Sequence, residues 1–526
     1  MKVQIKTGLI LGSESADVLN FKGIPYAAPI SGLNRWLPPQ PPLAFDGILD
    51  TRDYGHICPQ NVSIPPMWLF PKLAQIFMKT LTQNISTAQG ENCLNLNVWT
   101  ASKHENQRRP VMVFIHGGGL SLGSSVSQMF DGSALAKKGI VFVTFNYRLG
   151  TLGFLSGDGL FPGDVLKGNR GFMDQVAALE WVQENIAQFG GDPDNVTIVG
   201  SSGGGTSVWA LLASPKSEGL SHRAIVQSGP VNMIPIADQL KLSKAVLKKL
   251  KIEEGDIDAL AAIPDSKITG SIMQKTLMQR GEPFGEMSLT KLPTTGAYGT
   301  EFLPDDIFQA LAMGKARNID ILVGSNHHDG RASAIGMPLP KLWSIKLMNW
   351  FIAGMIDPTK EGRNKILKKY KSIMSKDSDY TVNEQIQTDA LYRMRGIKAA
   401  EIHSKTASAN TFMYQFNWES PVAEGKLGAI HGLEIPFVFN NLKECPELIG
   451  NTEAAQPLAS AMSDAWVSFA KTGKPTSELL PEWPTYNQES RNTMFFDSQC
   501  EVVSDPDAEI RKIWNNKIKN GTRKSG

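Results

Sequence analysis

Ser202 has the surroundings in this sequence that most clearly indicate chemistry. It lies in the motif GSSGG at residues 200–204, between a β-branched, apolar stretch at 195–199 and a helix-like stretch at 206–213 that Pro215 ends. Glycines two positions before and two positions after a serine allow a sharp turn from strand to helix, which exposes the serine hydroxyl above the carboxyl edge of a sheet. We therefore predict that Ser202 is a nucleophile.

Two other interpretations of this motif are weaker. A phosphate-binding loop would place a lysine at its end, where this chain has Thr206-Ser207-Val208. A purely structural turn would need no partner residues elsewhere in the chain. A serine nucleophile needs a base within hydrogen-bond reach, a carboxylate that orients the base, and donors for an oxyanion.

The candidate base is His431. In open α/β sheets with a serine nucleophile, the three groups follow in the order serine, acid, histidine. Of the eight histidines, only His403 and His431 leave room for an acid at a strand end after Ser202. His403 lies in a helical pattern that is typical of a structural position. His431 lies in a glycine-containing loop after a strand-like stretch, and such loops can bring a base to a nucleophile.

The candidate acid is Asp329, which comes just after the strand-like stretch 319–323. Open sheets present functional groups at the carboxyl ends of their strands. The alternative is that Asp329 only forms a turn with Gly330. The cluster His327-His328-Asp329 is also compatible with a metal ligand set, but we expect adjacent imidazoles in an extended loop to point apart, and no further ligand pattern follows.

An oxyanion site is predicted from a second glycine-rich segment, His116-Gly117-Gly118-Gly119, which follows the apolar stretch 111–115. Successive glycines allow main-chain amides to turn inward without obstruction by side chains. The N–H of Gly203, the residue after the nucleophile, is the further donor.

The elements that must position these residues follow an alternating pattern. A helical period over 173–189 ends at Gly190-Gly191, and the other helical patterns also lie between strands. This order predicts an α/β fold with a large, mostly parallel sheet flanked by helices, in one domain over residues 1–526. Helical insertions at about 236–292 and 339–405 are predicted to cap the active edge. The strand candidates are 95–99, 111–115, 140–145, 196–199, 224–227, 319–323 and 411–416, with 493–496 as an edge strand.

Composition narrows the function further. The chain has 526 residues, of which 41% are hydrophobic and 20% charged, and its formal net charge of +2 gives no electrostatic case for nucleic-acid binding. The uncharged run 110–130 contains too many Gly and Ser residues for a membrane-spanning helix. Strand-like sequence begins almost at Met1, which leaves no room for a leader. Either the protein stays in the cytoplasm, which is slightly favoured, or a leader has been removed. The four cysteines lack metal-ligand spacing, so no metal site is predicted. The chemistry predicted for Ser202 requires no cofactor.

The chain resembles the type B carboxylesterases, the cholinesterase-like branch of the α/β-hydrolases, over nearly its full length. The resemblance is carried by several motifs in the same order, and the stretch AWVSFAKTGKP at 465–475 is most similar to bacterial members. The other motifs are FKGIPYA at 21–27, ENCLNLNVW at 91–99, NYRLG at 146–150, QENIAQFGGDPDNVTIVGSSGG at 183–204, QSG at 227–229 and HGLEIPF at 431–437.

The resemblance implies an α/β-hydrolase fold and roles for the residues that match. Ser202, Asp329 and His431 would be the catalytic triad, and Gly118, Gly119 and Gly203 the oxyanion donors. Ser228 would lie beside the triad. The resemblance also implies a disulfide between Cys58 and Cys93 and ion pairs between Arg35 and Glu91 and between Arg148 and Asp174.

This chain departs from the family pattern at several site positions. Ser201 stands where the family usually has glutamate, which removes a buried negative charge and disfavours choline esters. Gly203 replaces the usual alanine, and Asp329 stands where many members have glutamate. Leu120 stands where an aromatic residue often follows the glycines, which is expected to widen the pocket.

The predicted activity is hydrolysis of small to medium apolar carboxylic esters through a covalent acyl-enzyme. An amidase, a carbamate hydrolase or a lactonase could use the same groups, because pocket shape selects the leaving group. A non-catalytic, cholinesterase-like binding domain is the alternative from another class. It is disfavoured because all three triad residues are present. The sequence does not indicate the natural substrate or the oligomeric state.

Overall fold

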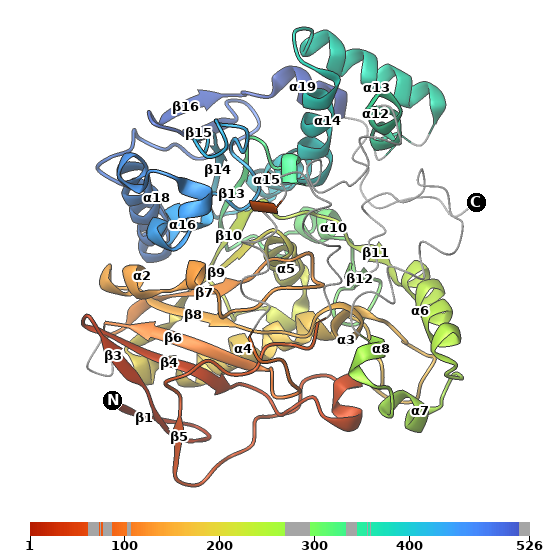
Figure 1. Cartoon of the computed structure of the whole chain (residues 1–526), viewed down its shortest axis with the longest axis vertical. Coiled ribbons are helices and arrows are strands. Elements are labelled where there is room, and N and C mark those ends of the chain that lie inside the picture. The colour runs from red at the N-terminus through yellow and green to blue at the C-terminus, as the bar shows by residue number, and fades with distance from the viewer. Residues whose placement is uncertain are drawn as a thin grey trace.

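An eleven-stranded sheet forms the centre of the molecule (Figure 1). The computed structural model describes residues 1–60, 73, 75–76, 87–101, 107–268, 295–332, 345–354, 356–357 and 359–514. The strand order is β16-β15-β14-β13-β10-β9-β7-β8-β6-β4-β3. The strands are β3 (Ser13–Ser15), β4 (Val18–Pro25), β6 (Asn95–Thr100), β7 (Arg109–Ile115), β8 (Val141–Phe145), β9 (Gly191–Ser201), β10 (Arg223–Gln227), β13 (Asp320–Asn326), β14 (Thr411–Phe416), β15 (Asn492–Phe496) and β16 (Glu501–Ser504).

The middle of the sheet is parallel, from β8 through β7, β9, β10, β13 and β14 to β15. The remaining pairs, towards β16 at one end and towards β3 at the other, are antiparallel. The predicted α/β class and mostly parallel sheet are therefore confirmed. The prediction that 493–496 forms an edge strand is wrong, because β16 pairs with the outer side of β15 and takes the edge.

The central strands are buried on both faces, which explains why they read as continuous apolar runs in the sequence. Successive side chains of a strand point to opposite faces. In β7, Val111, Val113 and Ile115 belong to one apolar core, whereas Met112 and Phe114 belong to the other. Each face of the sheet therefore has its own layer of helices.

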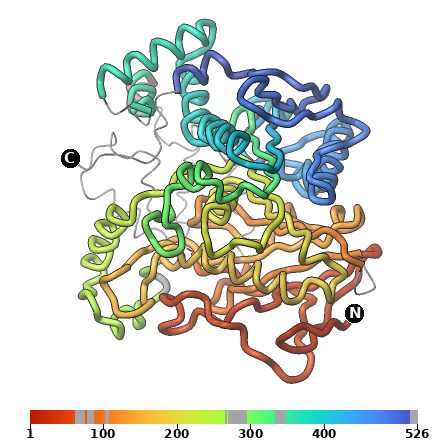
Figure 2. The backbone as a smooth tube through the Cα atoms, turned by 180° about the vertical axis from the view of Figure 1, so that it is seen from behind, coloured from red at the N-terminus to blue at the C-terminus, as the bar shows by residue number. Residues whose placement is uncertain are grey.

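One layer contains α4 (Arg170–Asn185), α5 (Gly203–Ala213), α10 (Ile307–Ala312) and α15 (Met394–Thr406). The other contains α2 (Ser133–Lys137), α16 (Ile435–Val438), α17 (Pro446–Ile449) and α18 (Thr452–Thr472). Figure 2 shows from behind that the N-terminal strands, in red, lie at the lower end of the molecule and the C-terminal chain, in blue, at the upper end. Because the central strands are parallel, their carboxyl ends lie along the same edge of the sheet, between the two helical layers.

Smaller elements complete the fold. A second sheet consists of β1 (Lys2–Ile5), β2 (Gly8–Leu11) and β5 (Ile48–Asp50), and a two-stranded sheet consists of β11 (Ile234–Pro235) and β12 (Ala297–Tyr298). The short helices include 3₁₀ turns at Gly32–Trp36, Gln128–Phe130, Ile186–Phe189, Pro215–Ser217 and Leu442–Glu444, together with α3 (Gly150–Phe154) and α19 (Ala508–Trp514).

Helices occupy the described parts of both predicted insertions. The first insertion, about 236–292, contains α6 (Ile236–Leu250), α7 (Ile257–Ala261) and α8 (Asp265–Ile268), and residues 269–294 lie outside the described residues. The second, about 339–405, contains α12 (Ile345–Ala353), α13 (Lys360–Ile373), α14 (Asp379–Thr388), a π-helical turn (Asp389–Arg393) and most of α15. In the described ranges, no helix is both long and apolar enough to cross a membrane.

Both ion pairs that the resemblance implies are present. Arg148 and Asp174 are fully buried, and the guanidinium bonds both carboxylate oxygens, with Nη2–Oδ1 at 2.6 Å and Nε–Oδ2 at 2.8 Å. Arg148 also donates to the carbonyl of Leu37 at 2.6 Å. The ion pair between Arg148 and Asp174 therefore joins the loop after β8, helix α4 and the N-terminal segment. Arg35 pairs with Glu91 nearer the surface.

The disulfide between Cys58 and Cys93 that the resemblance implies is not formed in the structure. Both cysteines are buried free thiols, and they lie close enough for Cys58 to raise the pKa of Cys93 through a hydrogen bond. Residues 61–72, which follow Cys58 in the loop between them, lie outside the described residues.

Candidate active site

Ser202 lies at the turn between β9 and α5, as the sequence predicts. Its backbone has φ 58° and ψ −123°, a strained conformation that residues other than glycine rarely adopt. The flanking glycines explain how the chain can turn so sharply. A Cβ on Gly200 would lie 2.2 Å from the carbonyl oxygen of Gly204, and a Cβ on Gly204 would lie 2.0 Å from that of Ile115. Any side chain at either position would therefore open the turn.

Asp329 and His431 form a close pair beside this turn. Nδ1 of His431 lies 2.7 Å from Oδ1 of Asp329, and the carboxylate is fully buried, whereas 13% of the histidine side chain is exposed. The other carboxylate oxygen, Oδ2, accepts from the Ser228 hydroxyl and from the Asn326 N–H, both at 2.8 Å. The carboxylate is thus fixed by three donors, and Ser228 lies where the resemblance implies.

Nε2 of His431 is buried and makes no hydrogen bond within the described part of the chain. The hydrogen bond between His431 and Ser202 that a complete triad would have is therefore not formed in this structure. Hydrogen bonds connect Ser202 to this pair indirectly: the Ser202 N–H donates to the carbonyl of Gln227, and the neighbouring residue Ser228 donates to Asp329. Catalytic hydrogen bonds are often long or unformed until substrate binds.

The charge of Asp329 controls the protonation of His431. Burial alone would lower the pKa of His431, but the hydrogen bond and negative charge of Asp329, with a further contribution from Glu434, outweigh burial and raise that pKa above its ordinary value. The Nδ1 proton is shared with Asp329, which leaves Nε2 of the neutral ring as the acceptor. This tautomer is the one that a general base needs.

Glu434 is a site residue that sequence reasoning missed. It is fully buried, and burial and then the charge of Asp329 raise its pKa above the ordinary value. Its Oε1 accepts from Gln227 Nε2 at 3.1 Å and from Ser201 Oγ at 3.5 Å, and its Oε2 accepts from Asn326 Nδ2 at 2.6 Å. Glu434 therefore links the ends of β9, β10 and β13 three residues after His431.

This contact changes the interpretation of Ser201. From the sequence, Ser201 is expected to remove a buried negative charge from the site. The structure retains an acidic group there, because Ser201 donates to Glu434. The only sequence signal for Glu434 was its place within the motif HGLEIPF, where nothing distinguishes it from an ordinary surface glutamate.

The predicted oxyanion segment lies against Ser202. A Cβ on Gly117 would lie 3.0 Å from Cβ of Ser202, and Gly118 and Gly119 have φ values of 106° and 59°. The N–H of Gly203 is at the first position of α5, where the helix itself offers it no acceptor. A Cβ on Gly203 would lie 2.9 Å from the backbone nitrogens of Gly119 and Leu120. The segment around Gly119 and Leu120 is therefore closer to the turn at Ser202 than an alanine at position 203 would allow.

The base of this loop is held by an aromatic stack. The ring of His116 lies on that of Tyr147 with centroids 4.5 Å apart, and the Tyr147 hydroxyl donates to the His116 carbonyl at 2.9 Å. Burial lowers the pKa of His116 to about 4, so its ring is neutral near pH 7. His116 consequently supports the glycines as an uncharged packing residue.

Comparison with known proteins now identifies the chain. A profile described as the carboxylesterase family matches residues 1–514. The chain belongs to the carboxylesterase family. It is 32% identical to para-nitrobenzyl esterase of Bacillus subtilis over 97% of both chains, and 32% identical to human cocaine esterase over 92% of this chain and 86% of that protein. A solved structure of a thermophilic PNB esterase matches with a TM-score of 0.84 and 30% identity, covering 98% of this chain and 99% of that one.

The carboxylesterase family and its α/β-hydrolase fold are thus confirmed, and the protein is a carboxylic ester hydrolase. Its other candidate histidines have structural surroundings. His403 is buried and bonds Thr411 Oγ1 at 2.8 Å and the carbonyl of Ala316 at 3.1 Å. The rings of His327 and His328 meet edge to face at 4.4 Å, so they do not point apart as expected. Across the described ranges, no group of acidic, histidine or cysteine side chains could hold a metal ion.

Trp68, Phe70 and Trp343 lie outside the described residues. Trp350 is described, and the guanidinium of Arg363 lies over its ring at 4.3 Å, which is a packing contact within the helical insertion.

Proposed function

We propose that this carboxylesterase hydrolyses small to medium apolar esters through an acyl-enzyme on Ser202. His431 acts as general base and then general acid, and Asp329 orients it. The observation that supports this proposal is the pair formed by Asp329 and His431, in which Nδ1 is bonded to the carboxylate and Nε2 makes no hydrogen bond within the described residues, together with the strained turn at Ser202.

In the first half of the reaction, Nε2 of His431 takes the Ser202 proton while Oγ attacks the ester carbonyl carbon. The carbonyl π electrons move to the oxygen, which the N–H groups of Gly118, Gly119 and Gly203 stabilise. The tetrahedral intermediate then collapses, the bond to the alcohol oxygen breaks, and the imidazolium gives its proton to the leaving alcohol. The acyl group remains on Ser202.

In the second half, water takes the place of the alcohol. His431 removes a proton from the water, the hydroxide attacks the acyl carbon, and Ser202 leaves with the proton that His431 returns. The chain needs no bound group for either half, because nucleophile, base, acid and donors are all its own side chains and amides.

The test replaces Ser202 with alanine and measures hydrolysis of short p-nitrophenyl esters. We expect kcat to fall by at least about 10³-fold, since loss of a triad member leaves only the oxyanion site and substrate binding. Ser221→Ala is the control, because Ser221 precedes the opposite, amino end of β10. Wild-type rates in the Ser202→Ala enzyme would refute the proposal, and the matching p-nitroanilides would show whether amides are also cleaved.

A further inference from the structure

The π-helical turn Asp389–Arg393 lies between α14 and α15 and contacts His431 and the backbone just before Asp329. A π turn inserts an extra residue into a helix and re-aims the side chains that follow, and such turns are frequent at functional sites. Here two consecutive side chains, Tyr392 and Arg393, reach the histidine and the loop of the acid. Neither contact is implied by the roles assigned above.

Tyr392 packs on the ring of His431. The two ring centroids are 4.6 Å apart, and the planes are inclined at 33°. The hydrogen bond to Asp329 fixes Nδ1 of His431 but not the plane of the imidazole, because the ring can still rotate about that contact. A tyrosine ring over one face restricts this rotation, and with it the direction in which Nε2 points.

The Tyr392 hydroxyl takes no part in this contact. It makes no hydrogen bond to any residue that the structure describes, and burial followed by the charge of Asp329 raises its pKa above the ordinary value. Tyr392 therefore stays neutral across the working pH range. Its aromatic face, which phenylalanine also has, is the part that meets His431.

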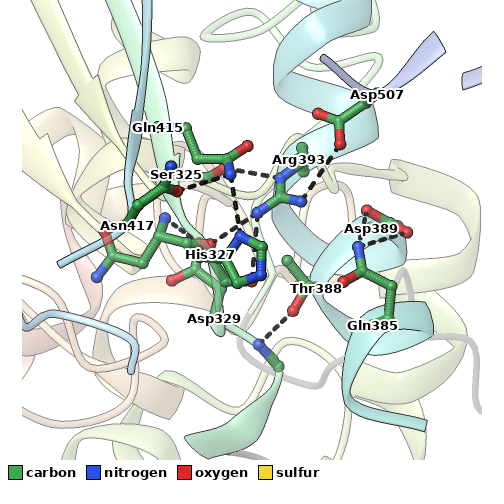
Figure 3. Close-up of polar contacts among 12 residues, drawn as sticks. Ser325, His327, Asp329, Gln385, Thr388, Asp389, Arg393, Gln415, Asn417 and Asp507 are labelled. Carbon is green, nitrogen blue, oxygen red and sulfur yellow. Dashed lines mark hydrogen bonds and ion pairs between the residues drawn. The ribbon is translucent and has the colours of Figure 1, made fainter. Parts of the chain in front are cut away.

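Arg393 holds the backbone just before Asp329 (Figure 3). Its Nη2 donates to the carbonyls of Asn326 and His327 at 3.1 and 3.3 Å, and its Nε donates to Ser325 Oγ at 3.4 Å. Only 4% of the side chain is exposed, and Asp507 lies 3.6 Å from Nη1 as the counter-charge. One guanidinium thus fixes the end of β13 and the first residue of the loop.

The same helical segment holds the other side of Asp329. The N–H of Gly330 donates to the hydroxyl of Thr388, the last residue of α14, at 2.8 Å. The turn itself is anchored at Asp389, whose carboxylate accepts from the Tyr370 hydroxyl at 2.8 Å and from Gln385 at 3.1 Å. The loop that carries the acid is therefore tied to one rigid element before and after Asp329.

We propose that Tyr392 and Arg393 are positioning residues for ester hydrolysis: Tyr392 sets the plane of the His431 ring, and Arg393 sets the backbone that places Asp329. This inference rests on the proposed function, because it assumes that His431 and Asp329 are the base and the acid. A displacement of about 1 Å in a catalytic group can cost about 10²-fold in rate.

The experiment compares Tyr392→Leu with Tyr392→Phe in the full chain, on the p-nitrophenyl esters used for Ser202→Ala. We expect Tyr392→Leu to lower kcat by roughly 10- to 100-fold with KM within about twofold, because substrate contacts are unchanged while Nε2 is less well aimed. Tyr392→Phe keeps the aromatic face and should retain kcat within about twofold of wild type. Circular dichroism and thermal unfolding establish that each variant is folded.

Arg393→Lys is the second variant, which keeps the charge beside Asp507 and loses the paired bonds to the two carbonyls. It should also lower kcat more than it changes KM, and the acid limb of its pH profile should move, because the distance from Asp329 to His431 sets the pKa of the base. A fall in stability without these kinetic changes would indicate packing alone and would overturn the proposal.

The variants distinguish a failure of the positioning role from a failure of the proposed function. If Ser202→Ala is inactive while Tyr392→Leu and Arg393→Lys keep wild-type kcat and pH profiles, the positioning role is wrong and the triad stands. If Tyr392→Phe loses as much activity as Tyr392→Leu, the ring contact is not the cause, and the role given to Tyr392 is also wrong. If Ser202→Ala keeps its activity, the proposed function is wrong and this inference fails with it.

Discussion

Replacing Asp329 with asparagine tests the acid–base pair with almost no change in shape. The native carboxylate accepts three hydrogen bonds, one at Oδ1 from His431 and two at Oδ2 from Ser228 and the Asn326 N–H. An asparagine has one acceptor oxygen and one NH₂ donor. The Asn326 N–H can only donate, so the amide oxygen must stay on its side, and the NH₂ group must face Nδ1 of His431.

That orientation gives the histidine the wrong tautomer. Nδ1 has to accept a hydrogen bond from the amide, so the neutral ring carries its own proton on Nε2 and cannot take one from Ser202. A comparable substitution in a Ser-His-Asp triad lowers kcat by about 10⁴-fold, or about 5 kcal/mol. We expect a loss of that order in kcat for p-nitrophenyl esters, with a much smaller change in KM, measured by steady-state kinetics on folded enzyme.

Ser228→Ala is the matched control, because it removes one donor to the same carboxylate and leaves its charge and its bond to His431. We expect a loss of about tenfold or less, since one hydrogen bond is worth about 1.5 kcal/mol. A loss below tenfold for Asp329→Asn, or equal losses in the two variants, would refute the reasoning about the tautomer.

Three further predictions follow from the charges. The value of kcat/KM should fall as the pH decreases through the pKa of His431, because the protonated ring cannot accept a proton. This pKa lies above its ordinary value of 6.5, so a midpoint below pH 6.5 would contradict the prediction. Ser201→Glu places a second carboxylate beside Glu434, so the acid limb should move to higher pH, and an unchanged or lower midpoint would show that the two positions are not coupled. Arg148→Met leaves a fully buried carboxylate unpaired and should cost about 3–5 kcal/mol in urea unfolding, whereas Lys6→Met, at an exposed pair, should cost under about 1 kcal/mol.

The sequence predicted the parts of the site that depend on local pattern. Ser202 was recognisable because strand, glycines and helix follow one another within a few residues, and the structure has that turn. Asp329 and His431 were recognisable because strand ends present functional groups and the order of the three residues is constrained. The structure places these two 2.7 Å apart, although 102 residues separate them in the chain.

The contacts that the sequence did not predict are those between distant segments. Tyr392 and Arg393 lie in a helical stretch without any pattern that distinguishes them, and their role depends on a π turn whose position no periodicity reveals. Glu434 is a charged residue in a loop motif, and composition alone would place it in solvent. Its burial depends on three polar partners from three strands that meet only in the folded sheet.

The central claim is that Ser202 becomes covalently acylated with His431 as its base. The most direct measurement is reaction with a fluorophosphonate followed by mass spectrometry of the digested protein, with the labelling rate compared between wild type and His431→Ala. The account predicts one adduct, on the peptide that contains Ser202, and labelling slowed by several orders of magnitude in the variant. An adduct on another residue, or equal labelling rates in the two proteins, would contradict it.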